Sequence, residues 1–98
     1  MNDIVLDNIH GQTSIIAWRE LARFFAGGKV FIVDNSLNLV EVAAAVSSDN
    51  TQAVSQWMNA NRLSVVSDEQ AFDWQQRDEQ LWAVVTAPWV LVQLIRKR

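Results

Sequence analysis

Four polar side chains could together bind a small polar ligand: Glu20, Arg23, Asp34 and Gln93. Glu20 and Arg23 are three positions apart on an expected helix. Asp34 follows an expected strand, where open α/β sheets often hold ligands, and Gln93 is the single amide in a long apolar run. A small-molecule binder or an enzyme is therefore one hypothesis. The more ordinary interpretation makes Glu20 and Arg23 a solvated helix face and Asp34 a turn residue.

The chain lacks the residue sets of the common catalytic and metal sites. It has no cysteine, which excludes disulfides, thiolate chemistry and cysteine-ligated metals. His10 is the one histidine, and only Asp3 and Asp7 are acidic neighbours in its segment, so a solvated histidine is expected. Gly27-Gly28 lacks the further glycines and the Lys-Ser/Thr step of a phosphate loop. We therefore expect no metal, no cofactor and no catalytic residue, which favours a non-enzymatic protein.

Length and composition predict one domain that spans residues 1–98, with a mobile segment at 1–12 and a basic tail at 96–98. Half of the 98 residues are hydrophobic and five are tryptophan, which supplies a core for a chain of this size. The absence of cysteine and of a signal peptide predicts a cytoplasmic protein. The longest apolar run is too short to cross a membrane.

The distribution of charge argues against nucleic acid as a partner. The net charge is −3, but residues 96–98 are all basic. Residues 1–95 carry five basic and eleven acidic side chains, a net charge of −6. A body of that sign repels a phosphate backbone.

Hydrophobic periodicity and turn residues predict an α+β fold of order α-β-α-α-β-α-β-β. Expected helices cover residues 13–26, 39–47, 51–60 and 68–79, and expected strands cover 29–33, 63–66, 81–86 and 89–95. Gly27-Gly28 ends the first helix, and the later helices begin after the capping residues Asn38, Asn50 and Ser67. We expect a small sheet of three or four strands, packed by the first and fourth helices.

Residues 81–95 carry no charge and are apolar on both alternating faces. Their β-branched residues favour two strands that meet at Pro88, although a helix continuing through Val85 is an alternative. One face or edge of the sheet is expected to stay open, and a two-fold dimer would close it. The expected contact residues are Trp82, Trp89, Val90 and Val92. The competing interpretation is that this run forms the core of a monomer.

Residues 39–66 have the apolar spacing of a helix-turn-helix with a following wing. The helix at 51–60 would be the recognition helix. It carries Gln52, Gln56 and Asn59 but no cation, and Arg62 is the nearest. Base and phosphate contacts usually require Arg or Lys, so a DNA-binding protein is an alternative that these residues disfavour.

Three segments resemble a small bacterial family that is known only as a domain of unknown function. They are Ile16–Ala26 (IAWRELARFFA), Val33–Ala43 (VDNSLNLVEVA) and Leu81–Gln93 (LWAVVTAPWVLVQ). The resemblance implies a bacterial cytoplasmic protein and transfers no site residue. Together with the apolar C-terminal run, it leaves as first hypothesis a soluble interaction or assembly module that self-associates.

Overall fold

The computed structural model describes residues 13–86 and 88–95. Within them lie five strands in one sheet, in the spatial order β1 (Ser14–Ala17), β4 (Gln80–Thr86), β5 (Trp89–Leu94), β2 (Val30–Val33) and β3 (Leu63–Val65). The strands β2 and β5 are parallel and the other neighbouring pairs are antiparallel. The helices are α2 (Trp18–Ala26), α3 (Leu39–Ser47), α4 (Thr51–Asn59) and α5 (Asp68–Arg77). The predicted α+β class is confirmed.

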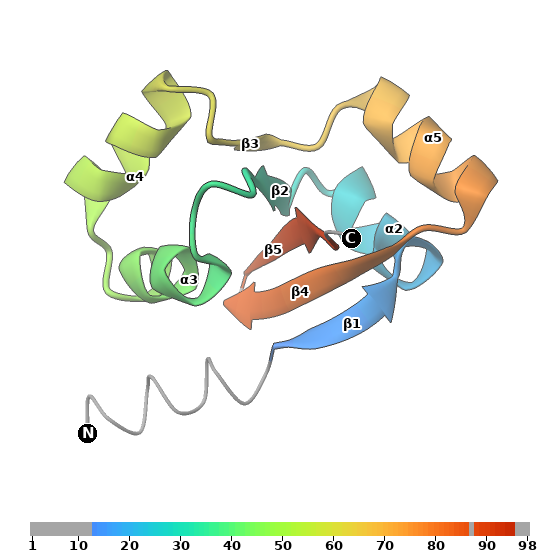
Figure 1. Cartoon of the computed structure of the whole chain (residues 1–98), viewed down its shortest axis with the longest axis horizontal. Coiled ribbons are helices and arrows are strands. Elements are labelled where there is room, and N and C mark those ends of the chain that lie inside the picture. Colours follow the sequence, from blue (N-terminus) through green and yellow to red (C-terminus); the bar gives the residue numbers. More distant parts are fainter. Residues whose placement is uncertain (1–12, 87, 96–98) are drawn as a thin grey trace.

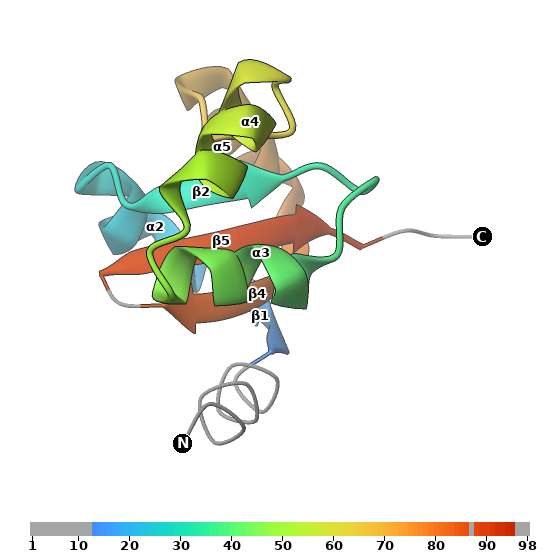
Figure 2. The same ribbon diagram turned by 90° about the vertical axis from the view of Figure 1, so that its left-hand side faces the viewer.

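Helices cover both faces of the sheet. Figure 1 shows α3 and α4 on one side and α2 and α5 on the other, and Figure 2 looks onto the α3 and α4 side. Trp18 of α2 and Trp74 of α5 are both 2% exposed and meet edge to face, with ring centroids 5.1 Å apart. The expected sheet of three or four strands, packed by the first and fourth helices, is therefore incomplete: the sheet has five strands, and α3 and α4 cover its second face.

The first helix is shorter than predicted because the first residues of the predicted helix form a strand of the sheet. Residues 14–17 form β1 and pair antiparallel with β4, from Ser14 opposite Ala83 to Ala17 opposite Gln80. The helix then starts at Trp18, whose backbone N–H donates to the Glu79 carbonyl at 2.8 Å. Helical periodicity alone cannot show this, because strand pairing depends on a partner far along the chain.

Side-chain caps fix where the other helices begin, as the sequence predicts. Asn38, Asn50 and Ser67 each accept a hydrogen bond from the backbone N–H three residues later, at 3.1, 3.2 and 3.1 Å. Each bond satisfies one of the free N–H groups of a helix N-terminus.

The strands β4 and β5 form the predicted hairpin, so the alternative of a helix through Val85 is wrong. Leu81 and Ala83 belong to the core under α2 and α5, whereas Val84 belongs to the core under α3 and α4. Val84 lies opposite Leu91 across the hairpin. In the described residues, no helix is long and apolar enough to cross a membrane.

Candidate functional site

Asp34 and Gln93 meet, but through hydrogen bonds that hold a loop. The Gln93 Nε2 donates to the backbone carbonyls of Asp34 at 3.0 Å and Leu37 at 2.9 Å. The Asp34 carboxylate accepts a hydrogen bond from the Ser36 backbone N–H at 2.9 Å, the pattern of an Asx turn. Gln93 thereby ties the loop between β2 and α3 to the central strand β5.

Glu20 and Arg23 lie on the opposite side of the sheet from Gln93. Both are exposed on α2, which packs on the face away from α3. The Arg23 guanidinium lies over the Phe24 ring, 5.0 Å from its centroid. The four polar residues singled out from the sequence therefore do not converge on one site.

His10 lies outside the described residues. Among the residues that the structure does describe, no group of three or more histidine, aspartate and glutamate side chains is placed to hold a metal ion.

The four expected interface residues fall into two pairs. Val90 and Val92 are 1% and 0% exposed, in the core beneath α2 and α5. Their side chains point to the face opposite Trp82. That face is covered by α2 and α5, so these side chains pack within the chain and are not available to a partner. Trp82 and Trp89 remain 38% and 37% exposed.

The two half-exposed tryptophans share one face of the sheet and lie at opposite ends of α3. Trp82 borders a shallow hollow with Asn38 and Leu39 at the start of the helix. Trp89 borders a more enclosed pocket with Val46 at its end. Because α3 covers the middle of the hairpin, each tryptophan is left at a margin of the helical layer, and these margins are the two candidate sites.

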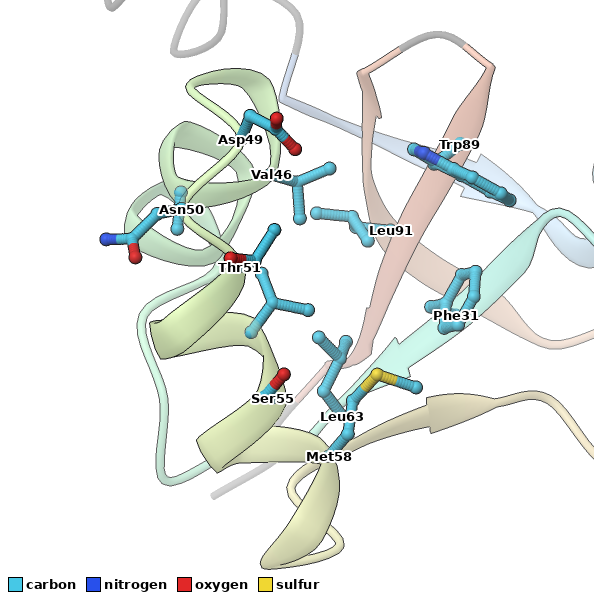
Figure 3. A pocket seen from close by; sticks show the side chains of 12 residues that line it. Phe31, Val46, Asp49, Asn50, Thr51, Ser55, Met58, Leu63, Trp89 and Leu91 are labelled. Carbon is cyan, nitrogen blue, oxygen red and sulfur yellow. The ribbon is translucent and has the colours of Figure 1, made fainter.

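The Trp89 pocket has a volume of about 320 Å³ and lies between the α3–α4 turn, α4 and the sheet (Figure 3). Its walls and floor are mostly apolar side chains. The lining residues are Phe31, Ala45, Val46, Asp49, Asn50, Thr51, Val54, Ser55, Met58, Leu63, Trp89 and Leu91. Small-ligand sites typically have volumes of roughly 300–1,000 Å³ and apolar walls with a few polar groups, and this pocket meets both criteria.

Two aromatic rings form the strand side of the Trp89 pocket. Phe31 of β2 and Trp89 of β5 pack edge to face, with centroids 5.5 Å apart and an interplanar angle of 84°. The Lys29 Nζ lies 5.8 Å from the Trp89 centroid. The sequence does not predict this pocket, because its residues come from three strands (β2, β3 and β5), from α3 and α4, and from the turn between the two helices. Met58 of α4 lines the pocket and is 41% exposed, which is unusual for a large apolar side chain.

The second candidate site, the Trp82 surface, consists of Ile15 and Trp82. These residues are directly opposite each other on β1 and β4, on the face that also carries α3. Ile15 is 49% exposed and Trp82 is 38% exposed. Since β1 is an outer strand of the sheet, this apolar pair lies beside an edge whose outward N–H and C=O groups have no strand partner among the described residues.

These features define a small α+β domain with a helix-covered mixed sheet. Residues 5–94 match the family described as "Protein of unknown function (DUF2288)", and the chain belongs to that family. The NMR solution structure of PA1075 from Pseudomonas aeruginosa is similar to this chain, with 43% sequence identity and a TM-score of 0.83. The likeness covers 92% of this chain and 83% of that one. No curated protein matches the sequence.

Proposed function

We propose that this protein is a non-enzymatic assembly module that forms a homodimer through the β1 edge of its sheet. The observation that carries the proposal is the Trp82 surface, two large apolar side chains about half exposed beside an outer strand. Exposed edges with apolar neighbours favour pairing with another chain. Of the interface residues expected from the sequence, this proposal retains Trp82, and it adds Ile15.

A two-fold axis perpendicular to the sheet explains why this edge suits self-association. Such an axis would place two β1 strands side by side in antiparallel orientation and keep the same face of each sheet on the same side. The Ile15 and Trp82 side chains of both copies would then form one apolar cluster across the junction. Burying it removes apolar surface from water in both copies at once.

The hollow next to Trp82 extends the apolar surface toward α3. Leu37, Leu39 and Val40 line it together with Trp82, and the polar residues Thr13, Asn38 and Gln93 complete it. A side chain of the partner chain that crosses the two-fold axis can pack into this hollow. The dimer contact is therefore wider than one pair of strands, as a specific interface requires.

Sedimentation at high micromolar concentration tests the dimer. We expect wild type and Ile15→Val to be dimers, because valine keeps the β-branched apolar surface, and Ile15→Lys to be a monomer. Phe72→Lys is the matched control, since Phe72 is 66% exposed on α5 over the other face and its change should leave the dimer intact.

Two results would count against the proposal. One is a compact wild-type monomer at all concentrations tested. The other is a dimer that resists Ile15→Lys but dissociates with Trp89→Lys, which would move the contact to the opposite end of α3.

A further inference from the structure

Most polar side chains of the Trp89 pocket come from its helical side, whereas the Trp89 indole N–H belongs to the strand side. Asp49, Asn50, Thr51 and Ser55 come from the α3–α4 turn and from α4, whereas Phe31 and Trp89 form the facing wall (Figure 3). The pocket is thus two-sided, with aromatic and aliphatic carbon on the strands and oxygen atoms along the helical margin. A ligand that fits it has an apolar body and one polar end.

Asp49 gives the polar side its charge. It is the only ionisable residue among the described residues that line the pocket. Its carboxylate has no hydrogen-bond or ion-pair partner in the described part of the chain, and in Figure 3 it extends toward the space in front of Trp89. The Asn50 amide is directed away from the pocket, where its oxygen caps α4 by accepting from the Ala53 N–H at 3.2 Å.

Asp78 has a cationic partner, which Asp49 lacks among the described residues. Both aspartates follow a helix in the left-handed conformation, with φ of 61° at Asp49 and 51° at Asp78. The Asp78 carboxylate is paired with the Arg19 guanidinium at 3.0 Å. Asp49 has the same backbone setting at the mouth of a pocket, without a cation from the described chain.

We propose that the Trp89 pocket binds a small organic amine, with an aromatic or branched apolar body and a primary ammonium group. The body packs against Phe31, Trp89 and the aliphatic floor. The ammonium donates to the Asp49 carboxylate at the α3–α4 turn. The exposed Asp49 carboxylate attracts an ammonium and repels a carboxylate ligand, whereas Lys29, 5.8 Å from the Trp89 centroid, carries the opposite charge on the strand side.

Three ligands of equal ring size test the charge preference: 2-phenylethylamine, the neutral 2-phenylethanol and 3-phenylpropionate. Titrations of the ¹⁵N-labelled wild-type protein, followed by NMR, should show amide shifts at Phe31 and Asp49 and a shift of the Trp89 indole. At low ionic strength we expect the amine to bind about tenfold more tightly than the acid, with the alcohol between them.

Two variants separate charge from shape. Asp49→Asn should weaken the amine about five- to tenfold and leave the alcohol unchanged, whereas Trp89→Ala should weaken all three ligands. Asp73→Asn is the matched control, because it removes the same charge from an exposed position on α5 and should change nothing. The proposal is overturned if the acid binds as well as the amine, if Asp49→Asn has no effect, or if millimolar amine leaves the pocket resonances unmoved.

Discussion

At the scale of single residues, Gln93 is a polar side chain in an apolar strand that acts on the backbone. It is partly buried and gives two hydrogen bonds to carbonyls of the loop before α3. From the sequence, Gln93 is the one amide in an apolar run, and one hypothesis was that it binds a ligand. Its true partners are backbone atoms of residues 34 and 37, which no pattern of residue types specifies.

Gln93→Leu should lower the free energy of unfolding by about 1–3 kcal/mol, because the Leu37 carbonyl loses the Gln93 donor and the Asp34 carbonyl keeps only the Leu37 backbone N–H. Gln93→Glu should cost more at neutral pH, since a carboxylate would face both carbonyl oxygens. Urea denaturation measures both effects. Gln76→Leu, at an exposed position on α5, is the control, and a midpoint for Gln93→Leu equal to that control would show that the loop does not depend on Gln93.

At the scale of elements, the sequence predicted the features that depend on residues close together in the chain. The caps at Asn38, Asn50 and Ser67 could be predicted because the capping side chain and its N–H partner are three residues apart. β1 could not be predicted, since Ile15 and Ile16 fit a helical face equally well. Their conformation is decided by β4, more than sixty positions away in the register.

Ser67→Ala should lower the free energy of unfolding by about 0.5–2 kcal/mol through loss of the α5 cap. The Ser67 hydroxyl accepts from the Gln70 N–H at 3.1 Å, and alanine leaves that N–H without a side-chain acceptor. Chemical denaturation of both proteins gives the difference. Ser64→Ala, an exposed change on β3, is the matched control, and equal midpoints for the two variants would contradict a stabilising cap.

At the scale of the whole molecule, the sequence indicated that both faces of the hairpin must be buried. It did not indicate how far the covering helices extend over each face. Residues 81–95 are apolar on both alternating faces, and each face of this hairpin lies in a hydrophobic core. The margins left by α3 follow from its length and position over the sheet. The Trp89 pocket and the Trp82 surface therefore depend on how the helices pack on the sheet, and they could not be predicted from the sequence alone.

The charge of the whole chain also bears on the helix-turn-helix alternative. The side chains of Gln52, Gln56 and Asn59 are exposed on α4, as a recognition helix would require, but this helix carries no cation. We predict no binding to mixed-sequence duplex DNA beyond weak, non-specific association, because phosphate contacts require Lys or Arg. Fluorescence anisotropy at low salt checks this, and tight binding that falls steeply as salt is added would favour the DNA-binding alternative.

An isotope-filtered NMR experiment tests most directly whether two copies of the chain meet at the β1 edge. A sample mixed from ¹³C-labelled and unlabelled protein at high micromolar concentration reports only contacts between copies. We predict nuclear Overhauser effects from the Ile15 methyl groups of one copy to the β1 edge or the Trp82 indole of the other, and none from Phe72. A sample in which Ile15 and Trp82 show no contact between copies would contradict the proposed dimer.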